Sequence, residues 1–292
     1  MKKKQGCFSF GSNWQSFVHK SLTSGRIHEA VDSLRTFFGL NDFEGQTFLD
    51  IGCGSGLFSL AARKLGATVH SFDLDPLSVA CTTELKRRYF PEDGGWTINQ
   101  GSVLDGDYLK SLGQFDLVYS WGVLHHTGAM WKAMGNVIPL VAEGGKLYIS
   151  IYNDQGRASR RWAALKKFYN QSPTPVQILM VLMVGGLSLI YSALARLIRL
   201  QNPLPFKEWA EKKESRGMSV WHDLVDWVGG YPFEVAKPEE IFDFYRDEGF
   251  ELMRLKTRSG RSGCNEFLFL RSPGREENRT AIEENRSKST RQ

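Results

Sequence analysis

The chain has few cysteines and little excess charge for its length. Its four cysteines, among 292 residues, lie far apart and form no C-x-x-C pair, which argues against a disulfide framework or a zinc site. The net charge is only +5, so the composition gives no reason to expect a nucleic acid partner. The basic start of the chain lacks the apolar run of a signal peptide, which predicts a cytoplasmic protein.

Apolar residues, in contrast, are plentiful at 41% and follow a regular pattern over residues 46–151. Short apolar runs alternate there with helical stretches, which is typical of βα units around a parallel sheet. Strands are predicted at 47–51, 68–73, 96–100, 115–120 and 146–151, with helices at 57–65, from 76 onward, and at 130–142.

After residue 151 the alternation ends. No clear strand is visible over 156–230, and the aromatic stretch 221–234 has no clear secondary structure. A helix at 238–248 and two closing strands at 250–257 and 266–270 follow, and 14–38 is predicted to form one or two capping helices. The expected plan is a helical cap (1–45), an α/β core (46–155), a helical and apolar insertion (156–236), a closing segment (237–271) and a disordered tail (272–292).

The first predicted strand leads into a glycine-rich turn, Asp50-Ile51-Gly52-Cys53-Gly54-Ser55-Gly56. Glycines let the backbone approach a ligand closely, and the following helix points its free N–H groups at it. Asp73 ends the second strand about 20 residues later, where an acid accepts the ribose hydroxyls of a nucleoside. The spacing G-x-G-x-G departs from the dinucleotide motif, and Asp50 suits an ammonium group better than a pyrophosphate. The pattern favours S-adenosylmethionine over NAD, and an NAD-dependent oxidoreductase is the disfavoured alternative.

Five segments in order carry a family resemblance: FLDIGCGSGLFSLAA, SFDLDP, INQGSVLD, FDLVYSWGVLHH and the glycine turn before KLYISIYN. They resemble the successive motifs of class I S-adenosylmethionine-dependent methyltransferases, and most nearly the group that includes the ubiquinone and menaquinone biosynthesis methyltransferases. The resemblance covers about residues 46–151 and, more loosely, 238–270. It implies an α/β, doubly wound, seven-stranded Rossmann-like sheet with an antiparallel last strand, and S-adenosyl-L-methionine as the cofactor.

The resemblance also implies roles for individual residues around the cofactor. Those expected to line its methionine end are Asp50, Gly52, Cys53, Gly54 and Gly56. Those expected around the ribose, the adenine and the rest of the cofactor are Asp73, Leu74, Ser102, Val103 and Trp121. Ser102 replaces an acid that is frequent in the family, and Leu74 and Val103 are equally compatible with plain packing.

Acceptor residues are expected just beyond the fourth and fifth strands, where α/β folds place ligands. The candidate catalytic residues are His125, His126, Tyr152 and Asn153, with His222 beside Asp223 and Asp226 as a further acid–base candidate. Each also has an ordinary structural alternative, as a cap, a packing residue or a surface turn.

Two catalytic features are missing from this region. Ser120-Trp121-Gly122-Val123 stands where base-modifying amino-methyltransferases carry a Pro-Pro-aromatic motif, so O- or C-methylation is expected rather than nucleobase methylation. Only Asn153 and Asp154 offer metal ligands, which are too few to predict a metal site.

The insertion contains an uncharged stretch from 168 to 195 whose core, 178–195, has the length of a membrane span. A crossing there would divide one sheet between the two sides of a bilayer, so a buried lid helix, a helix lying in the membrane interface or a re-entrant segment is expected instead. Eleven basic and only three acidic residues occur over 157–216, which suits anionic lipids.

These features predict a methyltransferase for a small-molecule or lipid-like acceptor, with peripheral membrane contact through 176–200 as one alternative for the apolar helix. A non-catalytic membrane-surface or partner-binding protein that retains the fold is the alternative function.

Overall fold

In the computed structural model of the chain, the described residues are 22–202, 220–260 and 262–273, together with Gly11, Trp14, Gln15 and Val18; for 220–223 only the backbone is described. The predicted disordered tail beyond residue 273 and part of the insertion, 203–219, therefore lie outside the description.

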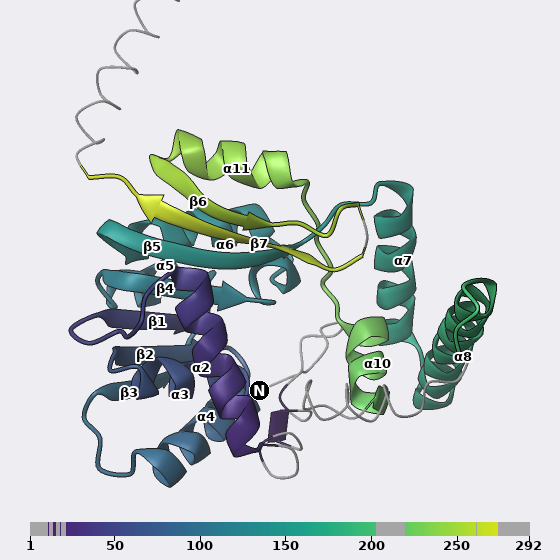
Figure 1. Cartoon of the computed structure of the whole chain (residues 1–292), viewed down its shortest axis with the longest axis horizontal. Coiled ribbons are helices and arrows are strands. Elements are labelled where there is room, and N and C mark those ends of the chain that lie inside the picture. Colours follow the sequence, from purple (N-terminus) through teal and green to yellow (C-terminus); the bar gives the residue numbers. More distant parts are fainter. Residues whose placement is uncertain are drawn as a thin grey trace, which may run out of the picture.

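The centre of the molecule is a seven-stranded sheet in the order β3-β2-β1-β4-β5-β7-β6 (Figure 1). Its strands are β1 (Thr47–Ile51), β2 (Thr68–Asp73), β3 (Trp96–Gln100), β4 (Phe115–Trp121), β5 (Val141–Tyr152), β6 (Phe250–Lys256) and β7 (Cys264–Arg271). The first five strands pair in parallel, and β7 pairs antiparallel with both β5 and β6. The predicted fold, including the antiparallel closing strand, is confirmed.

Helices cover both faces of this sheet. On one face, α2 (Ser24–Phe38), α3 (Leu57–Lys64) and α4 (Pro76–Tyr89) form a hydrophobic cluster with Phe48, Trp96 and Tyr148. On the other face, α5 (Gly106–Lys110), α6 (Met130–Val137) and α11 (Pro238–Asp247) pack on Leu49 and Val118. The two separate clusters make the fold doubly wound.

Local sequence explains where several helices begin. Asp75 precedes α4 and accepts a hydrogen bond from the Leu77 N–H at 2.9 Å, and Pro76 occupies the first turn, where its missing N–H costs nothing. Before α11, the Glu240 side chain accepts from the Lys237 N–H at 2.8 Å.

The segment after β5 forms the helices α7 (Arg157–Gln171), α8 (Thr174–Ile198) and α10 (Val220–Gly229). Tyr169, Val181 and Val228 are the buried residues of a third, smaller cluster that joins these three helices. Figure 1 shows α8 at the edge of the molecule, beyond α7 and α10. Among the described residues it is the one helix long and apolar enough to cross a membrane, with a mean hydropathy of 2.2.

Two predicted elements differ from the structure. The stretch beginning at residue 221, expected to lack regular structure, belongs to α10, which packs its apolar side chains on α7 and α8. The helix predicted to reach 142 ends at Val137, and β5 already begins at Val141. The glycine turn then bulges out of β5, because Val141 pairs with Phe115 and pairing resumes only between Lys146 and Leu117.

Candidate functional site

The turn after β1 has a backbone that only glycine adopts readily. Gly52, Gly54 and Gly56 have φ angles of +76°, +55° and +80°. A Cβ at Gly52 would lie 2.4 Å from the Val123 side chain, and one at Gly56 would lie 2.8 Å from Thr82. Both left-handed geometry and close approach therefore require the glycines at these positions.

The Asp73 carboxylate joins this turn to the end of β2. It accepts the Gly54 N–H at 3.0 Å and the Asp75 N–H at 2.8 Å, each on a different oxygen. Burial raises the pKa of Asp73, and these hydrogen bonds partly oppose the shift. Each carboxylate oxygen has a second lone pair for a hydroxyl donor. The residues present thus fit a ribose at this edge of the sheet.

Asp50, on β1 just before the glycine turn, is buried. A chain of hydrogen bonds runs from Trp96 Nε1 to Ser71 Oγ at 2.9 Å, on to Ser59 Oγ at 2.8 Å and to the Asp50 carboxylate at 2.5 Å. Burial raises the pKa of Asp50 to about 7, although the Ser59 hydrogen bond lowers it. Its carboxylate is therefore held from the α3 side.

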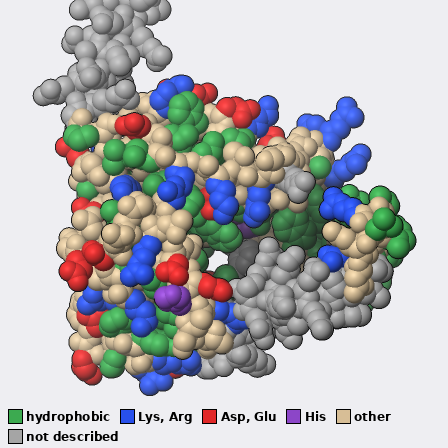
Figure 2. Space-filling model, in the orientation of Figure 1, with side chains coloured by type: hydrophobic (Ala, Val, Ile, Leu, Met, Phe, Trp, Pro, Cys, Tyr) green, Lys and Arg blue, Asp and Glu red, His purple; other side chains and the backbone are tan. Residues whose placement is uncertain are grey.

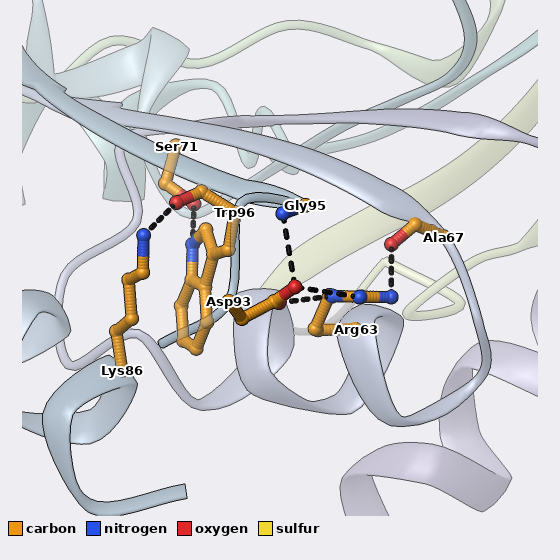
Figure 3. Close-up of polar contacts among 7 residues, drawn as sticks. All are labelled: Arg63, Ala67, Ser71, Lys86, Asp93, Gly95 and Trp96. Carbon is orange, nitrogen blue, oxygen red and sulfur yellow. Dashed lines mark hydrogen bonds and ion pairs between the residues drawn. The ribbon is translucent and has the colours of Figure 1, made fainter. Parts of the chain in front are cut away.

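Figure 3 shows the outer end of this chain and the polar contacts that fix its surroundings. The Arg63 guanidinium pairs with Asp93 and donates to the Ala67 carbonyl at 3.1 Å, which ties α3 to the loop before β3. Lys86 donates to the Trp96 carbonyl. The pairing with Arg63 lowers the pKa of Asp93 to about 2, so both members of this ion pair are charged at neutral pH.

Four other predicted cofactor residues fall into two groups. Cys53 and Val103 are buried; the Cys53 thiol accepts a hydrogen bond from Thr82 Oγ at 3.2 Å, and burial raises its pKa. Leu74, directly after β2, and Trp121, at the end of β4, are 68% and 46% exposed. Because β2 and β4 flank β1, these two side chains lie on either side of the glycine turn.

We call the glycine turn, Gly52 to Gly56, together with Asp73 the cofactor edge. Two more residues to consider with it come from the loop after β3 and from the N-terminal cap. Ser102 is half-buried, and its Oγ accepts the Leu104 N–H at 3.2 Å. Trp14 was predicted only as part of the cap, yet a Cβ at Gly54 would lie 3.1 Å from its indole nitrogen.

On the acceptor side, the structure brings together His125, His126 and Tyr152. The two histidines form the 3-10 helix η1 (Leu124–His126), and the Tyr152 ring lies 4.1 Å and 5.6 Å from their ring centroids. Phe233 and Trp227 approach Tyr152 at 5.0 Å and 6.3 Å. We call these five residues the aromatic chamber.

Both histidines are neutral at pH 7. Burial lowers the pKa of His126 to about 4 and that of His125 well below its ordinary value. His126 Nδ1 lies 2.5 Å from the Pro232 carbonyl, which only accepts, so Nδ1 carries the proton and Nε2 is a proton acceptor. Within the described part of the chain, neither ring nitrogen of the fully buried His125 makes a hydrogen bond of normal geometry.

The two other predicted catalytic residues are Asn153 and His222. Asn153 Oδ1 accepts a hydrogen bond from Asn265 Nδ2 at 3.1 Å, and its backbone N–H donates to the Gly263 carbonyl, so it ties β5 to β7. His222 belongs to the first turn of α10, but its side chain lies outside the described residues.

Lys166 was not among the predicted site residues and was counted only among the basic residues of the insertion. Lys166 is 1% exposed and donates to the Trp227 carbonyl. Its position three residues before the buried Tyr169 on α7 was the available signal, because residues three apart share a helix face.

Figure 2 shows the molecule hollowed between the sheet and the helical insertion, with hydrophobic side chains at the back of the hollow.

The strand order, the glycine turn and the acid after β2 define a class I S-adenosylmethionine-dependent methyltransferase domain. A family model described as a methyltransferase domain matches residues 23–179, just over half of the chain. The chain belongs to that family.

Individual relatives resemble parts of the chain. Over 64 residues it is 42% identical to a ribosomal protein L11 methyltransferase of Bacillus cereus, a match that spans 22% of this chain and only a fifth of that protein. A magnesium protoporphyrin IX methyltransferase of Synechocystis PCC 6803, solved with bound SAH, is similar with a TM-score of 0.50 and 16% identity, covering 89% of this chain and 94% of that one. The [4+2]-cyclase SpnF gives a TM-score of 0.52 at 12% identity, covering 84% and 81%. At these identities the two structures show the fold alone.

Proposed function

We propose that the protein transfers a methyl group from S-adenosylmethionine to an oxygen or carbon atom of a small-molecule or lipid-like acceptor. The observation that supports this most is that the glycine turn and the aromatic chamber are connected through Val123. Val123 packs on Gly52 of the glycine turn and directly precedes η1, which carries the two chamber histidines. Cofactor edge and aromatic chamber therefore meet at one residue.

When bound, S-adenosylmethionine supplies a methyl group on a positively charged sulfur: the acceptor atom bonds to the methyl carbon as the carbon–sulfur bond breaks, and the bonding electrons stay on sulfur. Since this methyl group is already activated, the chain's main tasks are to position the acceptor and exclude water. Asp73 would hold the ribose, with Leu74 and Trp121 on either side of the turn. A proton lost by the acceptor would go to His126 Nε2, which is unprotonated at neutral pH.

The apolar helix supports the lipid-like part of the proposal. Of its residues, only Val181 is buried, whereas Leu187, Ile190 and Leu194 are 64%, 59% and 55% exposed. A buried lid helix is therefore not what the described residues form. We propose that α8, about 37 Å long by its residue count, contacts a membrane surface from the cytoplasmic side.

A calorimetric titration with S-adenosylhomocysteine tests the cofactor site. Asp73→Ala should weaken binding at least 100-fold, because it removes the acceptor of the ribose hydroxyls. Asp107→Ala, which deletes an equal charge from a side chain that is 98% exposed, should leave the affinity unchanged. Wild-type protein that binds no S-adenosylhomocysteine would contradict the proposal.

The alternative is a membrane-surface protein that keeps the fold without methylating anything. The exposed α8 favours it, and SpnF shows that this fold serves other chemistry. The two functions differ in whether labelled methyl groups move from the cofactor to an extractable product.

A further inference from the structure

Lys166 carries its charged end inside the protein. The side chain extends from α7, and its Nζ lies 5.2 Å from the Trp227 ring centroid and 4.9 Å from that of Phe233. Aromatic faces attract an ammonium group at these distances. Lys166 thus packs against two of the five residues of the aromatic chamber.

The ammonium group of Lys166 has unused hydrogen-bonding capacity. It has three N–H donors, and one of them goes to the Trp227 carbonyl. Lys166 forms no ion pair with a carboxylate among the described residues. Burial lowers its pKa to about 8, and the charge of Asp226 opposes this shift only in part. A buried cation without a counter-ion in contact is costly, so a ligand that supplied one would bind favourably.

Capping α10 does not by itself account for a lysine here. Asn170 Nδ2, one turn further along α7, donates to the Gly229 carbonyl at 2.7 Å and so caps the same helix end with a neutral amide. The positive charge of Lys166 is therefore more than this helix junction needs.

Lys166 is also close to the predicted catalytic residues. The Phe233 ring that faces its amine lies 5.0 Å from Tyr152, which in turn lies 4.1 Å from His125. The charge of Lys166 contributes to the lowered pKa of both histidines. A ligand bound to the amine would extend along these rings toward η1.

We propose that Lys166 binds an anionic oxygen group of the acceptor, a carboxylate or an ionised phenol or enol, with the acceptor's apolar part against Tyr152 and Phe233. Its identification as the acceptor site rests on the proposed methyl transfer. The anion site itself stands on the contacts of Lys166 and is tested without turnover.

Two aromatic probes of similar size and different charge provide the test: 2-naphthoate, an anion, and 2-naphthalenemethanol, which is neutral. In calorimetric titrations, the wild-type chain should bind 2-naphthoate at least 10-fold more tightly. Lys166→Met should reduce this preference to less than threefold and still bind the neutral probe. Lys167→Met removes the same charge from the exposed neighbouring residue and should keep the preference.

A measurement on the wild type alone covers the case in which Lys166→Met does not fold. At pH 8.5 part of the Lys166 population is neutral, so binding of 2-naphthoate should take up a fraction of a proton, and at pH 6.5 it should take up almost none. Titrations in two buffers of different ionisation enthalpy measure this uptake. Asp226, His125 and His126 are the other groups that act on or near this amine, and both histidines stay neutral over the range.

Several results would overturn the proposal: no binding of 2-naphthoate to the wild type at millimolar concentration, an unchanged preference in Lys166→Met, or no proton uptake at pH 8.5. Titration of the same samples with S-adenosylhomocysteine distinguishes failure of the anion site from failure of the methyltransferase proposal. Lys166→Met should bind S-adenosylhomocysteine as the wild type does, since Lys166 lies on the acceptor side.

Discussion

The cofactor edge and the aromatic chamber are built in different ways. The cofactor edge uses backbone geometry, three left-handed glycines and one carboxylate that accepts two main-chain N–H groups, all within residues 52–75. The chamber uses side chains from η1, β5, α10 and the segment before α11, which are far apart in the sequence. A site made within one β-α-β unit is fixed by local spacing, whereas a site made from four segments depends on how the whole insertion packs.

The strongest test of this difference is Gly52→Ala, compared with Gly122→Ala. Both positions have φ = +76°, but a Cβ at Gly52 meets Val123 at 2.4 Å, while one at Gly122 meets nothing within 4 Å. Gly122→Ala should cost about 1 kcal/mol of unfolding free energy from backbone strain alone. Gly52→Ala should cost more and weaken S-adenosylhomocysteine binding over 100-fold, measured by denaturant unfolding and calorimetry. Equal effects of the two changes would show that close approach does not matter.

On the chamber side, His126→Asn should reduce turnover about 100-fold, the usual contribution of a general base. Asparagine keeps a donor for the Pro232 carbonyl but lacks the Nε2 acceptor. Methyl transfer to an acceptor that the wild type uses gives kcat, and S-adenosylhomocysteine affinity should not change. His70→Asn, on β2, is the matched control. A parallel loss of cofactor affinity would mean that the cofactor edge and the aromatic chamber are not separable.

A smaller effect is expected from changes to α8, the helix proposed to contact a membrane surface. Changing Leu187, Ile190 and Leu194 together to serine removes exposed apolar surface from α8 and should weaken binding to phosphatidylglycerol-containing vesicles about 10-fold. Flotation of the full chain with vesicles measures this. Met253 and Leu255 on β6 are also exposed, and their change to serine should have no effect. If both variants float like the wild type, α8 is not the lipid contact.

The smallest expected effect is the pH dependence of stability at the cofactor edge. The pKa of Asp50 is raised from 3.8 to about 7 in the folded chain, so its contribution to stability is present at low pH and is lost as the pH rises through 7. Between pH 6 and 7.5 the wild type should lose about 1 kcal/mol of unfolding free energy relative to Asp50→Asn. Denaturant unfolding at the two pH values checks this, and parallel changes in both proteins would contradict it.

Most of the sheet could be predicted from the sequence because each strand is a short apolar run between turn residues. The bounds of β1, β2 and β3 match the prediction, and α4 begins at Pro76 as predicted. The bulge in β5 escaped prediction because its glycine turn resembles a connection between elements, although the strand continues on both sides of it.

Of the candidate site, too, one part could be predicted from the sequence and the other could not. Gly52, Gly54 and Asp73 follow from spacing, since a βα turn and the end of the next strand are adjacent where consecutive parallel strands pair, as β1 and β2 do. Asp50 was expected to line the methionine end of the cofactor, and that stays a prediction; its hydrogen bond with Ser59 on α3 is visible only once the helix is packed. Lys166 and Phe233 meet across α7 and the segment before α11, and nothing in either local sequence predicts that contact.

The two ends of the helical insertion meet at the sheet. Asn153 and Ala236 form a parallel bridge, the Ala236 N–H donates to the Tyr152 carbonyl at 3.0 Å, and the Asp154 N–H donates to the Ala236 carbonyl at 3.1 Å. A segment whose ends are fastened side by side can be lengthened, shortened or exchanged without moving the strands on either side. The helical insertion can therefore vary in length and sequence independently of the glycine turn after β1.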